Sequence, residues 1–340
     1  MNRKFVFAVI VIAIVGLSAL GIGYITTLSP SQLGEPESVT VGNMLYEYSG
    51  LIFIAEDQDF FTANGLNITF KDYVSSVDSI KGLENKDTDI TLAPEYAVVT
   101  EAFNRENISI IGNVDKYQSV FLIGRKDRGI KNISDLSGKK IGASAGTIGE
   151  FYLGRFLSLN GMPMKNVTLV PIPAPQYVDA ITNGDVDAVV VLYKYLDESK
   201  ERLGDRIVEW PIQNSQKGYV VLASRNDWIA SHPDTIKRFL RSVKQAEEYS
   251  ISHPAESQEI IRKRMNYSEA TMAAIWPDHQ YSLTLDQSLI TAMEDESRWM
   301  ISGNMTNATA IPDFLHYVDV KGLDTVKPEA VNIIGMARSP

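Results

Sequence analysis

The sequence predicts an α/β protein of two lobes joined by a two-strand hinge, with a transmembrane helix at its N-terminus. Apolar strand patterns alternate with helical patterns through much of the 340 residues, which indicates parallel or mixed sheets. Residues 118–217 carry 13 basic and 11 acidic side chains. Residues 35–117 carry 5 basic and 15 acidic side chains, and residues 218–340 carry 12 basic and 16 acidic side chains. A slightly basic middle between acidic flanks fits one lobe inserted into the other.

The N-terminal segment has the length and composition of a membrane span. Residues 5–25 contain no charged side chain, and these 21 residues can cross about 30 Å of hydrocarbon as a helix. Arg3 and Lys4 precede the segment and favour a cytoplasmic N-terminus with an exported body. A cleaved signal peptide fits the same residues. We therefore expect a signal or membrane anchor over residues 1–25 and a polar linker over residues 26–37.

The following residues alternate between strand and helix signals. In the first part of the body, strands are expected at residues 38–44, 66–70, 89–93 and 108–114, and helices at residues 50–61 and 77–83. Gly65 lies where a helix commonly ends, and Pro94 stops a buried strand.

The same rhythm returns in the middle of the chain, and the last third becomes mostly helical. Strands are expected at residues 119–125, 140–143, 167–171, 187–192 and 218–223, and helices at residues 147–160, 177–182, 231–249 and 285–301. These elements assign residues 38–117 with 218–320 to lobe 1, residues 118–217 to lobe 2, and residues 321–340 to a C-terminal tail. Crossovers near residues 114–118 and 211–218 are expected to form the hinge.

Composition excludes several classes of function. The net charge of −10 argues against nucleic acid as a partner. The absence of cysteine excludes disulfides, thiolate metal sites, a cysteine nucleophile and a lipid-modified cysteine. The histidines at 232, 253, 279 and 316 have no metal-ligand spacing, and no catalytic motif is present. We therefore expect neither an enzyme nor a bound cofactor or metal.

Three segments carry a family resemblance. Residues 54–66 (IAEDQDFFTANGL), 122–141 (LIGRKDRGIKNISDLSGKKI) and 180–188 (AITNGDVDA) resemble, in order, motifs of substrate-binding proteins of ABC importers. The subgroup is the one for nitrate, aliphatic sulfonates, taurine and thiamine pyrimidine precursors. Asp59 stands where these proteins usually have glycine, and Leu20 stands where their lipoprotein cysteine would lie.

The resemblance covers roughly residues 38–320 and implies the type II periplasmic-binding-protein fold. It also implies an extracytoplasmic protein that captures a small polar or anionic solute, such as nitrate, a sulfonate or taurine, and delivers it to an ABC permease and its ATPase. A thiamine-pyrimidine or aromatic ligand, or a membrane-anchored sensory domain of the same fold, is the alternative. The expected partners are the small-molecule ligand, the permease with its ATPase, and the membrane through the N-terminal helix.

The strongest candidate binding loop is Ser144, Ala145, Gly146 and Thr147, where a strand ends just before a helix. Free backbone N–H groups at a helix N-terminus, with two hydroxyls beside them, can hold an anion or polar group. N-capping by Ser144 is the ordinary structural explanation. The family places ligand contacts in this loop, which favours binding.

Further candidates lie at the carboxyl ends of other strands, where open α/β sheets bind ligands. They are Tyr46, Glu47, Tyr48 and Ser49 after the first strand, Glu95 and Tyr96 after residues 89–93, Gln118 at the first crossover, and Tyr193 after residues 187–192. The tyrosines offer flat walls and hydroxyl donors. Glu47 and Glu95 disfavour an anion unless Lys116 or Lys194 neutralises them, and they suit an aminated ligand.

Asparagine sequons are unusually frequent. Seven Asn-x-Ser/Thr triplets start at Asn67, Asn107, Asn132, Asn166, Asn266, Asn304 and Asn307. With 18 asparagines and 46 serines and threonines in the chain, chance predicts about two or three. A glycosylated surface protein and a polar loop composition without glycan both fit this excess.

Overall fold

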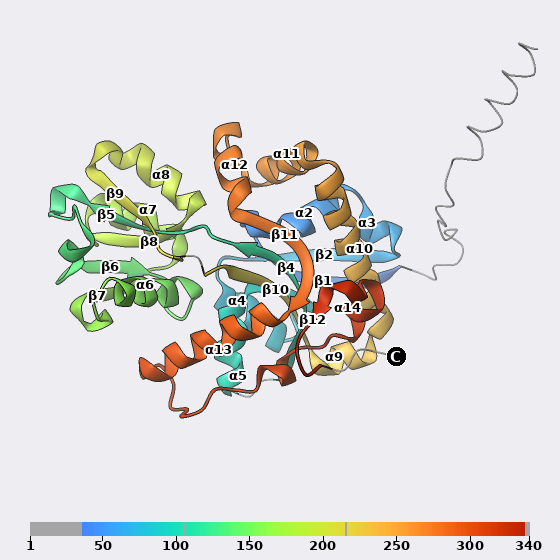
Figure 1. Cartoon of the computed structure of the whole chain (residues 1–340). Coiled ribbons are helices and arrows are strands. Elements are labelled where there is room, and N and C mark those ends of the chain that lie inside the picture. The colour runs from blue at the N-terminus through green and yellow to red at the C-terminus, as the bar shows by residue number, and fades with distance from the viewer. Residues whose placement is uncertain (1–35, 105–106, 215, 337–340) are drawn as a thin grey trace, which may run out of the picture. The chain divides into compact units, whose positions relative to one another are not determined.

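A computed structural model describes residues 36–104, 107–214 and 216–336 (Figure 1). The predicted anchor over residues 1–25 and nearly all of the predicted linker lie outside these residues. Among the helices that are described, none has the length and apolar composition needed to span a bilayer. The described residues belong to one compact unit.

Lobe 1 is built on a mixed sheet that has seven strands among the described residues, in the order β12-β11-β4-β10-β3-β1-β2. The strands are β1 (Glu37–Met44), β2 (Leu66–Tyr73), β3 (Ile90–Pro94), β4 (Ile108–Tyr117), β10 (Gly218–Arg225), β11 (His279–Asp286) and β12 (Val331–Asn332). β1 runs parallel to β2 and β3, whereas β10 is antiparallel to β3 and β4. The helices of this lobe are α2 (Gly50–Asp57), α3 (Phe60–Ala63), α4 (Ser76–Glu84), α5 (Glu95–Asn104), α9 (Asn226–Ser231), α10 (Pro233–Ser252), α11 (Pro254–Met265), α12 (Glu269–Ile275), α13 (Gln287–Ser302) and α14 (Lys321–Val326).

Lobe 2 is built on a second mixed sheet, whose five strands lie in the order β7-β6-β8-β5-β9 in the part of the chain that is described. Its strands are β5 (Val120–Arg125), β6 (Lys140–Ala143), β7 (Thr168–Pro171), β8 (Ala188–Leu192) and β9 (Ile207–Pro211), and its helices are α6 (Ile148–Leu159), α7 (Tyr177–Asn183) and α8 (Tyr193–Leu203). The chain passes between the sheets from β4 to β5 and again from β9 to β10 (Figure 1).

A single buried amide joins these two crossovers. Gln213 accepts a hydrogen bond from the backbone N–H of Val120 at 3.0 Å and donates to the carbonyl of Tyr117 at 3.0 Å. A buried side chain of one connecting segment that satisfies backbone groups of the other holds the two in a fixed relation.

The first resemblance motif serves the core of lobe 1. Asp59 precedes α3 with φ of 55°, a left-handed conformation that accounts for the glycine common at this position in the family. Phe61 is buried and stacks on Phe239 of α10 with ring centroids 5.2 Å apart. Phe61 therefore anchors α3 against α10 in the core of lobe 1.

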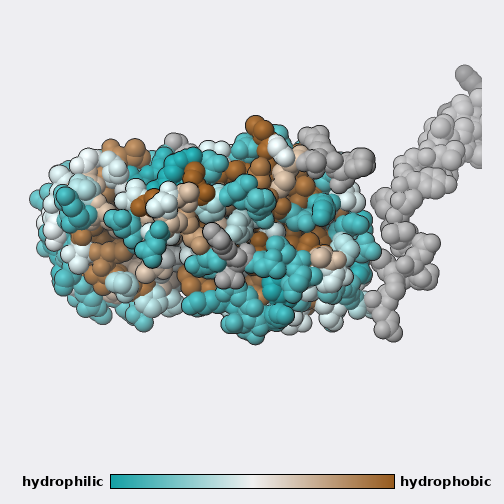
Figure 2. All heavy atoms as spheres, turned by 90° about the horizontal axis from the view of Figure 1, so that it is seen from below, coloured by the Kyte–Doolittle hydropathy of each residue, from teal (hydrophilic) through white to brown (hydrophobic). Residues whose placement is uncertain are grey.

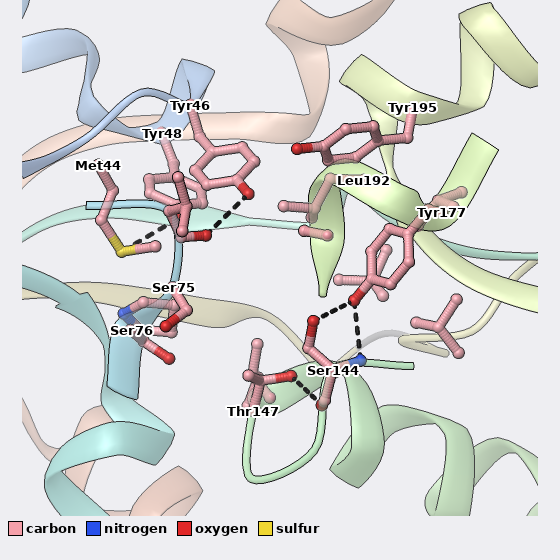
Figure 3. A pocket seen from close by; sticks show the side chains of 18 of the residues that line it. Met44, Tyr46, Tyr48, Ser75, Ser76, Ser144, Thr147, Tyr177, Leu192 and Tyr195 are labelled. Carbon is pink, nitrogen blue, oxygen red and sulfur yellow. Dashed lines mark hydrogen bonds between the residues drawn. The ribbon is translucent and has the colours of Figure 1, made fainter. Parts of the chain in front are cut away.

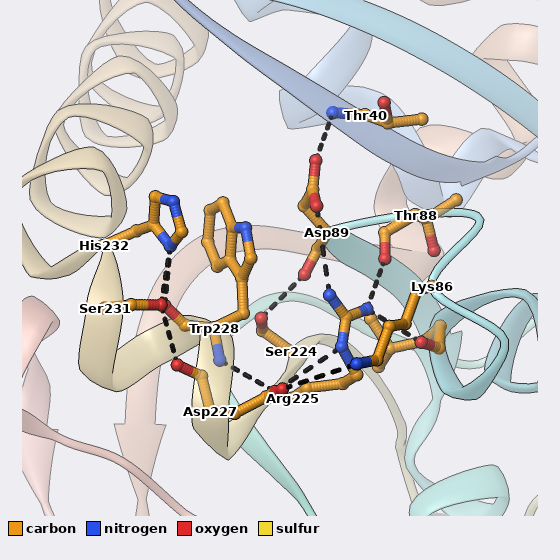
Figure 4. Close-up of polar contacts among 11 residues, drawn as sticks. Thr40, Lys86, Thr88, Asp89, Ser224, Arg225, Asp227, Trp228, Ser231 and His232 are labelled. Carbon is orange, nitrogen blue, oxygen red and sulfur yellow. Dashed lines mark hydrogen bonds and ion pairs between the residues drawn. The ribbon is translucent and has the colours of Figure 1, made fainter.

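A partly buried guanidinium at the end of β10 links several segments of lobe 1 (Figure 4). Arg225 donates to the carbonyls of Leu83 at 2.8 Å and Thr88 at 2.7 Å, and its Nε lies 3.5 Å from Asp227. Asp89 accepts from the backbone N–H of Thr40 at 2.8 Å. This network ties the end of β10 to the α4–β3 connection.

The predicted C-terminal tail from residue 321 is corrected by the structure. Residues 321–332 form α14 and β12, and β12 pairs with β11 at the edge of the sheet. Lys327 donates to Glu247 at 2.5 Å and to the carbonyl of Leu283 at 3.1 Å. The predicted helix over 285–301 begins at Gln287, because β11 continues to Asp286. Figure 2 shows hydrophilic residues over much of the lower face, with hydrophobic residues in small groups between them.

Candidate functional site

A small cavity lies between the lobes and takes its walls from both (Figure 3). It encloses about 80 Å³, room for only a few water molecules, so the lobes stand close together. Its lining has no Asp, Glu, Lys, Arg or His. The lining consists of Met44, Tyr46, Tyr48, Val74, Ser75, Ser76, Pro94 and Tyr117 from lobe 1, and Val120, Ser144, Thr147, Ile148, Gly149, Ala174, Tyr177, Val190, Val191, Leu192 and Tyr195 from lobe 2.

The wall from lobe 1 is aromatic. Tyr46 and Tyr48 follow β1, and their rings stack with centroids 5.2 Å apart. Tyr48 also contacts the ring of Tyr117 at 5.5 Å. The Tyr48 hydroxyl reaches only the sulfur of Met44, at 3.5 Å, and the buried Tyr117 hydroxyl has no hydrogen-bond partner among the described residues. These two hydroxyls leave hydrogen-bonding capacity beside the cavity.

The wall from lobe 2 is a hydroxyl network. Tyr177 donates to Ser144 Oγ at 2.6 Å and accepts from the Ser144 backbone N–H at 2.8 Å. Ser144 Oγ donates to the carbonyl of Ile172 at 3.0 Å, and Thr147 donates to the carbonyl of Ser144 at 2.8 Å. The network fixes the loop before α6 and presents neutral hydroxyl oxygens to the cavity (Figure 3).

Tyr195 of α8 faces Tyr46 across the cavity in Figure 3. Its ring meets Tyr177 edge to face at 5.5 Å. Lys194 lies above the rings of Tyr46 and Tyr195, with Nζ 5.7 Å and 5.8 Å from their centroids, but it is not part of the lining. A cation in this position is attracted by both rings.

The phenols of the cavity are neutral. Burial is the main cause that raises the pKa above the ordinary 10.0 in every one of the five tyrosines of the lining, which are Tyr46, Tyr48, Tyr117, Tyr177 and Tyr195. At physiological pH these side chains therefore offer hydroxyl donors and carry no charge.

The loop predicted to bind an anion is occupied by groups of the chain itself. Glu150 accepts from the backbone N–H of Gly146 at 2.9 Å, so a carboxylate already lies at the N-terminus of α6. Ser144 and Thr147 line the cavity, whereas Ala145 and Gly146 do not. The expectation of free backbone donors there is thus corrected for Gly146, because the side chain four residues later binds it.

Of the residues predicted at strand ends, Tyr46 and Tyr48 line the cavity and the others are used elsewhere. Glu47 is buried and accepts from the Tyr267 hydroxyl at 2.8 Å, and Ser49 donates to the carbonyl of Met44 at 2.7 Å. Glu95 accepts from the backbone N–H of Tyr219 at 3.0 Å.

The remaining three predicted residues, Tyr96, Gln118 and Tyr193, lie where the lobes touch. The ring of Tyr96 packs on Phe151 of α6 with centroids 6.2 Å apart. Gln118 donates its backbone N–H to the carbonyl of Asp278 at 2.9 Å, and Tyr193 donates its hydroxyl to Asp278 Oδ2 at 2.9 Å. These three residues join the lobes and do not line the cavity.

The sequence analysis missed Ser75, Ser76, Tyr177 and Tyr195. Ser75 precedes α4 and Ser76 is the first residue of α4, so they form a strand-to-helix junction of the same kind as residues 143–147, and this signal could have found them. Tyr177 and Tyr195 lie in the first turns of α7 and α8, and only the folded arrangement turns them toward the cavity.

Comparisons with known proteins agree with this architecture. A family model described as NMT1/THI5 like matches residues 47–257. A putative binding protein of Brucella abortus is 22% identical over 255 residues, which cover 73% of this chain and 78% of the relative. A putative aliphatic sulfonates-binding protein of Bacillus subtilis is 22% identical over 60% of this chain and 61% of its own length.

Solved structures show the fold. The alkanesulfonate-binding protein of Xanthomonas axonopodis pv. citri bound to MOPS superimposes with a TM-score of 0.71 at 14% identity, over 82% of this chain and 97% of that one. A desulfurization enzyme superimposes with a TM-score of 0.64 at 14% identity, over 86% of this chain and 99% of the enzyme. The bilobal fold is therefore shared by binding proteins and by an enzyme, and the site has to distinguish them.

Proposed function

Since the chain belongs to the NMT1/THI5-like family, we propose that it is an extracytoplasmic solute-binding protein that captures a small molecule between its lobes for an ABC importer. The observation that carries this proposal is a cavity walled by both lobes beside two crossover strands. A ligand that contacts both lobes stabilises the closed form by its differential affinity. The permease and its ATPase are proposed partners, and residues 1–25 are the proposed membrane tether.

Binding without catalysis is supported by the chemistry of the lining. Tyrosine is the one titratable residue type in it, and burial keeps the phenols protonated. A nucleophile activated by an adjacent base, or a pair of carboxyls, would be needed for the commoner hydrolytic reactions. The lining offers hydroxyls, ring faces and aliphatic side chains, which hold a ligand and leave it unchanged.

For the ligand, we propose an uncharged or weakly basic ring compound such as an aminopyrimidine or another aromatic solute. Nitrate or a sulfonate would bring a full negative charge into a lining without Lys or Arg. Burying an unpaired charge costs several kcal/mol. Glu150 and Asp78 lie in the first turns of α6 and α4 and offset the positive ends of these helices.

A ring ligand would find both kinds of contact that it needs. Tyr46 and Tyr195 provide faces for stacking, and the Tyr177–Ser144 network provides hydroxyls for ring nitrogens or substituents. The cavity has about half of the ~150 Å³ that accommodates benzene in an apolar protein cavity. We therefore expect the side chains of the lining to rearrange around the ligand when the lobes close on it.

The test is a thermal-shift and calorimetric panel on residues 36–340 with aminopyrimidines, aromatic acids, taurine, alkanesulfonates and nitrate. We expect a ring compound to raise the melting temperature, since a ligand that binds the native state stabilises it by mass action. Tyr46→Ala and Tyr195→Ala should abolish the shift. Tyr249→Ala should retain it, because Tyr249 packs on Phe60 away from the cavity.

The outcomes separate the role from the ligand class. Binding of a sulfonate or nitrate with no response to ring compounds would overturn the ligand class and leave the role as a binding protein intact. Turnover of a bound compound, followed by chromatography, would overturn the role itself.

A further inference from the structure

The seven sequons are not explained by the binding site. Chance predicts about two or three from the 18 asparagines and 46 hydroxyl residues. The middle residue of each triplet is Ile, Val, Tyr, Met or Ala and never Pro, as an acceptor for asparagine-linked glycan requires.

The fold places all seven sequon asparagines at exposed positions. They occur on both lobes, and none of them lines the cavity or lies in a crossover. The buried asparagines of the described residues, Asn43, Asn64 and Asn113, are all outside sequons. Every sequon asparagine is therefore accessible, as attachment of a bulky glycan requires.

Local structure explains part of this pattern, since Ser268 of the Asn266 triplet caps α12 and Thr306 of the Asn304 triplet accepts from the Ala308 backbone N–H. Asn132 caps a short 3-10 helix, and Asn266 and Asn304 have φ of 55° and 53°, where asparagine is favoured. In contrast, Asn67, Asn166 and Asn307 form no side-chain hydrogen bond among the described residues. Their side chains are available, and no conformational requirement selects asparagine there.

Two of these three asparagines, Asn67 and Asn166, lie in or next to a strand at the edge of a sheet. Asn67 and Thr69 project from one face of β2, the last strand of the first sheet. Asn166 precedes β7, the outermost strand of the second sheet, and Thr168 begins it. Exposed edge strands invite pairing with other chains, and natural proteins protect them. A bulky hydrophilic group at these positions would provide that protection.

We infer that the exported chain is a glycoprotein that carries asparagine-linked glycans at these sequons, foremost at Asn67, Asn166 and Asn307. The inference rests on the extracytoplasmic location in the proposed function. The donor is a lipid-linked oligosaccharide whose first sugar is bonded through C1 to a phosphate. The side-chain amide nitrogen forms a bond to C1 while the C1–O bond breaks. The phosphate leaves with the electron pair, and the amide loses one proton to a base of the membrane transferase.

The test is peptide mass spectrometry of the full chain purified from membranes of its own cells. Peptides containing Asn67, Asn166 and Asn307 should carry sugar increments and release sugar fragment ions. The exposed asparagines Asn85, Asn160 and Asn183, which lack a hydroxyl residue two positions later, should be unmodified.

A substitution that keeps the asparagine isolates the sequon. Thr69→Ala should abolish the glycan at Asn67 and leave the glycans at Asn166 and Asn307 in place. Unmodified peptides at all three asparagines in the native protein would overturn the inference, whether or not the protein binds its ligand. Glycan on the control asparagines would also overturn it, since the triplet would then not direct the modification.

Discussion

Two buried carboxyls behind the cavity predict an unusual dependence of stability on pH. Glu95 begins α5 and Glu296 lies in α13, and both are fully buried. Neither forms an ion pair with a described residue, and they interact with each other. Two ionised carboxylates can only accept hydrogen bonds, so a hydrogen bond between Glu95 and Glu296 requires that one of them keeps its proton. Burial raises the pKa of Glu95 to about 8, and burial together with Glu95 raises the pKa of Glu296 well above its ordinary value.

The sign and size of the effect follow from linkage. The unfolded chain loses the proton of Glu95 near pH 4.5, whereas the folded chain keeps it to about pH 8. Between these values the folded state binds more protons, so the free energy of unfolding falls as pH rises. A pKa raised from 4.5 to about 8 lowers the free energy of unfolding at pH 8, relative to acidic pH, by on the order of 5 kcal/mol from Glu95 alone.

The perturbation is Glu296→Gln, which keeps the shape of the side chain and removes one ionisable group. Its amide can also donate to Glu95 and stabilise the carboxylate, which lowers the pKa of Glu95. We expect the wild type to lose roughly 10 °C of melting temperature between pH 5 and pH 8, at about 2 °C per kcal/mol for a chain of this size. The variant should lose less than half as much and should be the more stable protein at pH 8.

The assay is thermal unfolding followed by circular dichroism at half-unit pH steps. Glu294→Gln on the same helix is the matched control, because Glu294 is partly exposed in an ion pair with Arg298. The buried His279 also contributes to the dependence of stability on pH. Burial lowers the pKa of His279, but Asp115 beside it raises the pKa more, so it adds a slope of the same sign. A wild-type slope that Glu296→Gln leaves unchanged would refute the acid pair as its source.

Three further predictions concern the cavity, the stability of lobe 1 and the contact between the lobes. Ser144→Ala combined with Thr147→Ala should weaken binding of the ring ligand about tenfold in calorimetry with little change in melting temperature; unchanged affinity would remove this loop from the site. Arg225→Met should lower the free energy of unfolding by about 2–4 kcal/mol in urea titrations and leave ligand affinity unchanged, since it strands two buried carbonyls far from the cavity. Gly154→Ala should favour the open form in small-angle scattering, because its Cβ would lie 2.6 Å from the Trp299 ring of the other lobe; an unaltered scattering profile would contradict this.

Strong local patterns made much of the fold predictable from the sequence. The strand at Ala188–Leu192 is a run of apolar residues, and the α10 helix begins with a proline and keeps its apolar residues on one face. β11 escaped prediction because only Leu283 and Leu285 of its eight residues are buried. β12 has two residues and exists only because α14 and β11 position it, which no local pattern encodes.

The candidate site was predictable only as far as the loops that surround it. Strand ends pointed to the correct part of the fold, yet a side chain there can contact the ligand or the opposite lobe. Tyr46 lines the cavity and Tyr193 bonds to the opposite lobe, although both are tyrosines at the end of a strand. The difference depends on Asp278, a residue 85 positions away from Tyr193 in the chain. Such a pairing is fixed by tertiary structure and cannot be inferred from spacing.

The lobe contacts themselves set part of the ligand affinity. Thr271 of lobe 1 donates to Asp197 of lobe 2 at 2.7 Å, and Tyr193 donates to Asp278 at 2.9 Å, so polar bonds hold the lobes together without help from a ligand. The apparent affinity equals the intrinsic affinity multiplied by the populated fraction of the binding-competent form. A closed form that is favoured in advance binds tightly, but the ligand has to enter through the open form, so release is slow. Thr271→Val should therefore weaken affinity and quicken release together, although Thr271 lies outside the cavity.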